Sequence, residues 1–564
     1  MLSDVIEIAR AWLAEDPDPD TRAELEALLE ADDREGLADR FAGLLQFGTA
    51  GLRGELGAGP NRMNRAVVIR AAAGLAAYLK TVYLTDTVAP AATRNAVVIG
   101  FDARYKSDVF ARDTAAVLEA AGLHALLLPR PLPTPVLAYA IRHLGCVAGV
   151  MVTASHNPPR DNGYKVYLGD GSQIVPPADA EIAGRIAAIG PLADVPRAED
   201  GWETLGEALI DSYLDRALTV VDPAGPRDVR IVHTAMHGVG TTVMLGAFDR
   251  AGFADVRPVP EQADPDPDFP TVAFPNPEEP GAMDLAFRTA LAEDADVVIA
   301  NDPDADRCAV AVPDASVAGG WRMLRGDEVG ALLGAEVARR GTDGVLATTI
   351  VSSSLLGAIA QADGLAYTET LTGFKWLARV PNLAFAYEEA LGYCVDPAGV
   401  CDKDGVTAAL MLAELAAGAK RDGRTLPGLL DDIAGRYGLY ATDQYSVRVD
   451  RLESIADAMR ALREQTPRAL GDLAVAAADD LLHPAADGLP PTDGLRYTLA
   501  GDGADLTAGR VVVRPSGTEP KLKAYLEVVV DPKRIAEIGI DAARTAAHAA
   551  LERLKRDLAT TLGM

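Results

Sequence analysis

The chain is poor in cysteine, in positive charge and in long apolar runs, and each shortage excludes a class of protein. Its 564 residues include four cysteines, none in a C-x-x-C pair, so we expect a reduced protein without disulfides. No uninterrupted apolar stretch is long enough to span a bilayer, and the N-terminus lacks the basic start and apolar core of a signal peptide. We therefore expect a cytoplasmic protein with no membrane partner.

Negative charge exceeds positive charge by a wide margin. Asp and Glu number 82 against 53 Lys and Arg, which gives a formal net charge of −29. Such a balance argues against binding nucleic-acid phosphates through a basic surface, so we expect no nucleic-acid partner. An anionic small molecule would need a locally positive cleft, and the cationic residues that could form one are Arg53, Lys165, Arg307, Lys375 and Arg514.

Strand-like apolar runs alternate with Ala- and Leu-rich helical segments after an N-terminal region of about forty residues. That region reads as helices interrupted at Asp16-Pro17-Asp18-Pro19-Asp20. The alternation beyond it predicts α/β domains, and the length corresponds to about three to five of them. The predicted boundaries give three α/β units at 1–210, 211–320 and 321–437, followed by a smaller α+β unit at 438–564.

A serine lies on a loop punctuated by Pro and Gly. Residues 153–158 read Thr-Ala-Ser-His-Asn-Pro and follow the apolar run 149–152, which predicts a buried strand that delivers Ser155 to a sheet edge. The alternative is a turn whose polar side chains only satisfy backbone groups. His156 is not expected to act as a base for Ser155, because sequence neighbours rarely face each other and no G-x-S-x-G elbow is present. We assign His156 an orienting role.

Three aspartates at alternate positions follow a second apolar run, 297–300. In an extended segment Asp302, Asp304 and Asp306 project to the same side, and their carboxylates repel unless a cation lies between them. An incomplete set of oxygen ligands, with room for water and a phosphate oxygen, suits one Mg²⁺ better than Ca²⁺. The spacing of an EF-hand is absent. The alternative is an acidic surface turn.

Two further loops carry groups suited to a sugar phosphate. Residues 514–521 read Arg-Pro-Ser-Gly-Thr-Glu-Pro-Lys, which has the donors of a phosphate cradle without Walker spacing, although an ordinary hairpin turn is the alternative. Glu388 and Glu389 lie between the apolar segment 383–386 and Leu391, with Lys403-Asp404-Gly405 further on. Carboxylates in such surroundings need partners, which sugar hydroxyls would supply.

Taken in order, these four loops resemble those of the α-D-phosphohexomutase superfamily. The resemblance is closest to its phosphoglucomutase/phosphomannomutase members, including the phosphoglucomutase-2 branch that also covers phosphopentomutases. Segments 47–54, 98–104 and 372–376 support it. It implies three similar α/β domains with mixed sheets and a smaller C-terminal α+β phosphate-binding domain, arranged around a central cleft.

The resemblance also implies roles for individual residues. Ser155 would carry the phosphoryl group, and its phosphate would complete the Mg²⁺ shell of the three aspartates. Arg53 and Arg307 would neutralise charge near the phosphoserine, and Lys165 would take part in proton transfer. Substrate-binding residues would be Lys375, Glu388, Arg514, Ser516, Gly517 and Thr518, of which Glu388 would bind sugar hydroxyls and the 514–518 loop the phosphate that is not reacting.

The implied activity is a mutase that interconverts sugar 1-phosphates and 6-phosphates, of glucose or mannose, through a phosphoserine and a bisphosphate, with glucose 1,6-bisphosphate as activator. One departure bears on the sugar: Ala390 and Gly392-Tyr393 stand where many relatives have Ser and Gly-His. The alternatives are a phosphopentomutase and a Mg²⁺-dependent sugar phosphatase. A non-catalytic sugar-phosphate sensor would have no reason to keep both Ser155 and the aspartates. The sequence does not indicate an oligomeric state.

Overall fold

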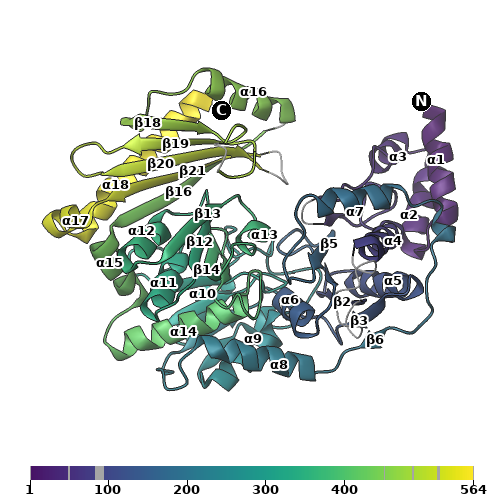
Figure 1. The fold of residues 1–564 in the computed structure, drawn as a ribbon, viewed down its shortest axis with the longest axis horizontal. Helices are drawn as coiled ribbons and strands as arrows, with labels where there is room; N and C mark the ends of the chain where they lie inside the picture. Colours follow the sequence, from purple (N-terminus) through teal and green to yellow (C-terminus); the bar gives the residue numbers. More distant parts are fainter. Residues whose placement is uncertain are drawn as a thin grey trace. The chain divides into compact units, whose positions relative to one another are not determined.

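A computed structural model describes residues 2–48, 51–82, 95–449, 451–484, 488–516 and 521–562 of the chain. It divides into two compact units, one formed by Met1–Met323 with Gly392–Gly418 and the other by Leu324–Leu391 with Ala419–Met564 (Figure 1). The first unit opens with the helices α1 (Leu2–Glu15), α2 (Pro19–Glu30) and α3 (Arg34–Arg40), which pack around Ala9, Leu25 and Leu37. The predicted helices and their interruption at residues 16–18 are confirmed.

The first sheet is mixed and has the strand order β1-β5-β4-β2-β3-β6. The neighbours β2, β3 and β4 run parallel, whereas β5 is antiparallel to β4 and to β1. The strands are β1 (Leu52–Glu55), β2 (Ala96–Phe101), β3 (His124–Leu127), β4 (Ala148–Val152), β5 (Asp161–Leu168) and β6 (Glu203–Thr204). The associated helices are α4 (Arg65–Val82), α5 (Ser107–Ala120), α6 (Thr134–His143) and α7 (Ala178–Ala187).

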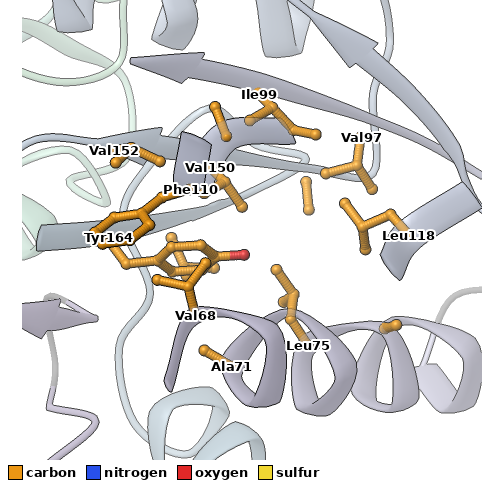
Figure 2. Close-up of a cluster of buried hydrophobic side chains, with 14 of the residues drawn as sticks. Val68, Ala71, Leu75, Val97, Ile99, Phe110, Leu118, Val150, Val152 and Tyr164 are labelled. Atoms are coloured by element: carbon orange, nitrogen blue, oxygen red, sulfur yellow. The ribbon is translucent and has the colours of Figure 1, made fainter. Parts of the chain in front are cut away.

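Helix α4 lies against this sheet because its apolar residues recur at helical spacing. Val68, Ala71 and Leu75 form one face of α4 and meet alternate strand residues such as Val97 and Ile99 of β2, as Figure 2 shows. Val150, Val152 and Tyr164 complete the strand side of this core, and Phe110 and Leu118 come from α5. The apolar core therefore anchors β4 up to Val152, the last residue before the serine loop.

The second sheet also belongs to the first unit and has the order β11-β10-β9-β7-β8. Strand β7 runs parallel to β8 and β9, and β10 is antiparallel to β9 and β11. The strands are β7 (Ile231–Thr234), β8 (Val256–Pro258), β9 (Val297–Ala300), β10 (Ala309–Pro313) and β11 (Trp321–Met323). The remaining elements of this part are α8 (Ala208–Ala217), α9 (Gly240–Ala251), α10 (Asp284–Ala292), β15 (Gly392–Cys394) and α14 (Gly405–Arg421).

The second unit contains a parallel arrangement of β13-β12-β14 and an antiparallel C-terminal sheet. The parallel strands are β12 (Val345–Thr349), β13 (Ala366–Thr370) and β14 (Leu383–Glu388), with helices α11 (Gly326–Arg339), α12 (Leu355–Asp363), α13 (Phe374–Leu377) and α15 (Leu426–Tyr437). The C-terminal sheet has the order β16-β21-β20-β19-β18-β17. Its strands are β16 (Leu439–Arg448), β17 (Ala469–Leu470), β18 (Leu473–Asp480), β19 (Leu495–Ala500), β20 (Ala508–Pro515) and β21 (Lys521–Val530).

One face of the C-terminal sheet is covered by helices near the end of the chain. Helices α16 (Leu452–Glu464) and α18 (Ile540–Leu562) contribute Met459, Leu462, Leu551 and Leu554 to a core with the strands, and α17 (Pro532–Ile538) precedes α18 (Figure 1). The predicted α/β class with mixed sheets is confirmed. The domain boundaries stay predictions, since residues 392–418 pack with the first unit although they follow β14 in the chain. None of the helices in the described ranges combines the length and apolar composition that a membrane crossing requires.

Candidate active site

The serine loop connects β4 to β5 and holds Ser155 in an unusual backbone conformation. Ser155 has a φ of 51°, in the left-handed region that costs a non-glycine residue about 1–3 kcal/mol, so its surroundings must hold it there. Its N–H donates to Thr153 Oγ1 at 2.9 Å, and its hydroxyl donates to Asp302 Oδ2 at 2.7 Å. The predicted strand before Ser155 is confirmed, and the hydroxyl lies against the predicted metal loop.

His156 contacts Ser155, contrary to the expectation that sequence neighbours do not face each other. Its Nδ1 lies 3.2 Å from Ser155 Oγ, because a left-handed turn rather than extended backbone separates the two side chains. Burial, followed by repulsion from Arg307 and Arg53, keeps the pKa of His156 well below its ordinary value. The imidazole is therefore neutral at neutral pH and can fix the direction of the serine hydroxyl.

The three aspartates lie together between β9 and β10 and are almost fully buried. Carboxylate oxygens of Asp302, Asp304 and Asp306 lie within 4.8 Å of one another. Burial, with repulsion from Asp304 and Asp306, raises the pKa of Asp302 well above its ordinary value. Asp304 Oδ1 and Asp306 Oδ1 are buried and have no hydrogen-bond partner among the described residues. Unpaired carboxylate oxygens at this spacing fit a hard divalent cation, so the residues suit Mg²⁺.

Two lysines face the same carboxylates. Lys165 Nζ, on β5, donates to Asp304 Oδ2 at 2.7 Å and to Asp306 Oδ2 at 3.2 Å. Lys403 Nζ lies 3.1 Å from Asp306 Oδ2 and was not assigned to the site from the sequence. Its only local signal was the Lys-Asp-Gly turn before α14. Residues 392–418 thus bring a second ammonium group to the aspartates of the first unit.

The two arginines expected near the phosphoserine also lie in this cluster. Arg53, on β1, donates from Nη1 to Asn157 Oδ1 in the serine loop at 3.0 Å. The Nε of Arg307 is 3.9 Å from Asp302 Oδ2, and its backbone N–H donates to Asp302 Oδ1 at 3.1 Å. The first unit therefore assembles a hydroxyl, three carboxylates, two ammonium groups and two guanidinium groups, which is a set suited to phosphoryl transfer.

The remaining predicted residues belong to the second unit. Glu388 ends β14 and accepts a hydrogen bond from Gly373 N at 2.7 Å, which ties it to the segment that carries Lys375. Glu389 Oε2 accepts from Ser352 Oγ at 3.0 Å, and burial, with repulsion from Glu388, raises the pKa of Glu389 to about 7.

The predicted phosphate cradle, residues 514–521, begins at the end of β20. Arg514 lies near the end of that strand, beside Tyr525 of β21, and the N–H of Ser516 donates to Lys521 O at 2.8 Å. Gly517 and Thr518 lie outside the described residues. The pairing of β20 with β21 places Arg514 opposite Lys523 in the register, so two cationic residues share this end of the sheet.

Comparison with known proteins gives four family matches in chain order. They are phosphoglucomutase/phosphomannomutase alpha/beta/alpha domain I over residues 44–192, domain II over 211–317, domain III over 325–437 and the C-terminal domain over 447–544. A probable phosphomannomutase of Haemophilus influenzae is 46% identical over 480 residues, covering 84% of this chain and 94% of that protein. A probable phosphoribomutase of Schizosaccharomyces pombe is 37% identical, covering 92% of this chain and 93% of that protein.

A solved structure supports the fold. The putative phosphomannomutase from Thermus thermophilus aligns with a TM-score of 0.68 at 24% identity, covering 91% of this chain and 99% of that one. At this identity the likeness concerns the architecture alone. Together with the four domain matches, it agrees with three α/β domains followed by a C-terminal domain.

Proposed function

Because the chain belongs to the phosphoglucomutase/phosphomannomutase family and is a phosphosugar mutase, we propose that it interconverts sugar 1-phosphates and 6-phosphates through phosphorylated Ser155. The observation that carries this proposal is the contact of Ser155 Oγ with Asp302 Oδ2 at 2.7 Å, beside carboxylate oxygens left without donors among the described residues. A serine that only made hydrogen bonds to the backbone of a turn would not need a buried carboxylate cluster with two lysines beside it.

In the forward half-reaction, phosphorylated Ser155 gives its phosphoryl group to a hydroxyl of the sugar monophosphate. The bond between the serine oxygen and phosphorus breaks and a bond between the sugar oxygen and phosphorus forms. The proton leaves the sugar hydroxyl and ends on the freed serine oxygen, which becomes a hydroxyl again. Lys165 Nζ contacts Asp304 and Asp306, which form one cluster with the Asp302 that Ser155 contacts, and it takes part in this proton transfer. The resulting bisphosphate turns round and returns its other phosphate to Ser155.

Charge stabilisation is the main demand of phosphoryl transfer, and this chain supplies it from several directions. Arg53 and Arg307 neutralise the phosphate on Ser155, and His156 orients the serine oxygen. Asp302, Asp304 and Asp306 would hold Mg²⁺ together with a phosphoserine oxygen. When bound there, the ion supplies further neutralisation of the transferring group.

The second unit supplies groups for the rest of the substrate. Glu388 accepts hydrogen bonds from sugar hydroxyls, and Lys375 lies two residues beyond the Gly373 N–H that Glu388 binds. Arg514 and Ser516, with Gly517 and Thr518, hold the phosphate that is not reacting. Each group must accept two orientations of the sugar, because the two phosphates exchange roles within one catalytic cycle.

Glucose and mannose phosphates are the proposed substrates, and pentose phosphates are the second candidate. Ala390 supports the pentose candidate, because it has no side-chain hydroxyl at a position where the family resemblance implies a serine in many relatives. Fewer hydroxyl contacts at this position weaken the distinction between sugars that differ in one hydroxyl or one carbon.

A substrate panel tests the proposal. Purified protein is assayed with Mg²⁺ and glucose 1,6-bisphosphate on glucose 1-phosphate, mannose 1-phosphate and deoxyribose 1-phosphate, with product isomer and inorganic phosphate measured together. We expect conversion of the hexose phosphates with far less than stoichiometric phosphate release. Faster conversion of the pentose phosphate would favour a phosphopentomutase, and phosphate release equal to substrate loss would favour a phosphatase.

A further inference from the structure

Arg104 binds the backbone of the serine loop, and the mechanism proposed above gives this residue no role. Its guanidinium donates to four backbone carbonyls of one short segment: Nη2 to Ser155 O and Asn157 O, each at 2.6 Å, and Nη1 to Pro158 O at 2.7 Å and Asp161 O at 3.1 Å. Only 1% of the Arg104 side chain is exposed. A single buried cation therefore gathers the carbonyl groups of the whole loop.

The guanidinium is itself held from two further sides. Asp102 Oδ2 lies 3.4 Å from Arg104 Nε, while Asp102 Oδ1 accepts from the N–H of Arg104 at 3.0 Å and from Ser107 Oγ at 2.6 Å. The ring of Phe269 lies against the guanidinium, with its centroid 4.9 Å from Cζ. A planar, delocalised cation suits this combination of forked donation and stacking, which a lysine cannot reproduce.

The serine loop needs such an anchor. Ser155 has a φ of 51°, and the segment between β4 and β5 makes turn-type backbone hydrogen bonds, such as Asn157 N to Ala154 O at 3.0 Å and Asp161 N to Pro158 O at 3.0 Å. Buried carbonyls without donors are costly, and carbonyls that converge on one point repel one another. The guanidinium removes both costs at once and so selects this one conformation of the loop.

We propose that Arg104 is a positioning residue for phosphoryl transfer, because it clamps the backbone of residues 155–161 and thereby fixes Ser155 Oγ against the aspartates. This inference rests on the proposed role of Ser155 as the phosphoryl carrier. Arg104 acts through the loop backbone, whereas Arg53 and Arg307 act on the phosphate charge. Its loss should therefore lower the rate of transfer more than the affinity for the sugar phosphate.

The test is Arg104→Lys, with Arg65→Lys as the matched control. Arg65 binds Asp113 through two hydrogen bonds of 2.7 and 2.8 Å, and its hydrogen bonds in the described part of the chain go to Asp113 and Pro17 rather than to the serine loop. For Arg104→Lys at saturating substrate and bisphosphate, we expect kcat to fall roughly ten- to a hundredfold, and KM to change less than about threefold.

Hydrogen exchange provides a readout that does not depend on turnover. Amides of residues 153–161 should exchange at least about tenfold faster in Arg104→Lys than in the wild type, while Arg65→Lys should leave them unchanged. Phe269→Leu removes the stacked ring but keeps an apolar side chain, and it should give a smaller effect in the same direction. This variant keeps the test open if Arg104→Lys does not fold.

The experiments can contradict the positioning role of Arg104 and the proposed mutase function independently of each other. Equal losses of thermal stability in the two arginine variants, with kcat per folded molecule and loop exchange both at wild-type values, would reduce Arg104 to a structural role. A wild type that isomerises none of the sugar phosphates would overturn the proposed function, and the exchange of residues 153–161 would still decide whether Arg104 orders the loop.

Discussion

Ser155 combines a buried hydroxyl with a backbone conformation that serine rarely adopts. The N–H bond to Thr153, the hydroxyl bond to Asp302 and the Arg104 bond to its carbonyl fix this residue on three sides. None of these contacts places the serine side chain in an apolar core. The side chain therefore adds little to core packing, as expected of the proposed phosphoryl carrier.

We predict that Ser155→Ala abolishes turnover and leaves the protein folded. Loss of the hydroxyl removes the phosphoryl acceptor, while its contacts with Asp302 and His156 contribute on the order of 1–3 kcal/mol to the free energy of unfolding. Intact-mass analysis should show a phosphorylated fraction in the wild type and none in the variant, with similar melting temperatures. Sustained mutase turnover by Ser155→Ala would contradict the phosphoserine mechanism.

Asp304 is the central carboxylate of the triplet and one of the two with an unpartnered buried oxygen among the described residues. Asp304→Ala should lose most Mg²⁺ affinity and most activity, because two carboxylates and the phosphoserine then have to hold the ion alone. Calorimetric titration with Mg²⁺ and activity in chelator measure both effects. Exposed Asp541→Ala, whose side chain is 98% exposed, is the control. Full activity of Asp304→Ala in excess chelator would exclude this site.

Asp404 offers a prediction on pH and stability. Burial raises the pKa of Asp404 from 3.8 to about 6, so the folded state binds the proton more tightly than the unfolded state. The contribution of Asp404 to the free energy of unfolding is therefore fully present below pH 3.8. It falls by on the order of 3 kcal/mol as the pH rises through about 6.

In Asp404→Asn that part of the pH dependence should disappear. The asparagine oxygen can still accept from Tyr213 OH at the site of the 2.9 Å bond and from the N–H groups that begin α14, while the amide replaces an oxygen without a partner among the described residues. Urea unfolding between pH 4 and about 6.5 measures the difference. Parallel pH profiles for wild type and variant would contradict the assignment.

At the scale of elements, the serine loop and its clamp begin at the same edge of the first sheet. Strands β2 and β4 are parallel neighbours, and the register pairs Phe101 with Val152, so the segments that follow them leave the sheet side by side. Asp102 and Arg104 come from one segment and Ser155 from the other. This arrangement is the usual one in open α/β sheets, where sites form beyond the carboxyl ends of strands.

In the second unit, the prediction at this scale concerns Arg514 at the end of β20. Arg514 should bind the distal phosphate through paired N–H bonds whichever end of the sugar reacts, and such charge-assisted bonds contribute about 1.5–3 kcal/mol. Arg514→Ala should weaken binding of the 1-phosphate, the 6-phosphate and the bisphosphate together, by roughly ten- to a hundredfold. Exposed Arg544→Ala serves as the control. Weaker binding of only one of the two monophosphates would contradict the proposal that Arg514 binds the distal phosphate in both orientations of the sugar.

At the scale of the whole molecule, a strongly acidic chain places several cationic side chains at the proposed phosphoserine site. The net charge is −29, yet Arg53, Lys165, Arg307 and Lys403 all lie around the serine and aspartate loops of the first unit. Four cationic side chains around three carboxylates leave this cluster a formal excess of one positive charge, opposite in sign to the net charge of the chain, which favours an anionic substrate.

The proposed catalytic cycle predicts a dependence on bisphosphate. Enzyme stripped of its phosphoserine should be nearly inactive on glucose 1-phosphate until catalytic amounts of glucose 1,6-bisphosphate restore the phosphate on Ser155. The lag before turnover and the mass of the protein should change together as bisphosphate is added. Full activity of the stripped enzyme without any bisphosphate would count against the cycle.

The sequence by itself determined the α/β class, the strand before Ser155 and the grouping of Asp302, Asp304 and Asp306, because each depends on spacing within a few residues. Local periodicity sets which side of a strand or extended loop a residue occupies. The four loops could also be recognised from the sequence, since the functional groups of each lie within fewer than ten consecutive residues.

Only the tertiary structure decided which distant residues meet. Lys403 reaches Asp306 across 97 positions of the chain, and Arg104 reaches the carbonyl of Ser155 across 51, through strand order and helix packing that local spacing does not encode. The contact between His156 and Ser155 depended on a left-handed turn that the surrounding contacts impose. The backbone propensity of serine alone would predict a negative φ at position 155. The left-handed conformation is stable there only because tertiary interactions outweigh its cost.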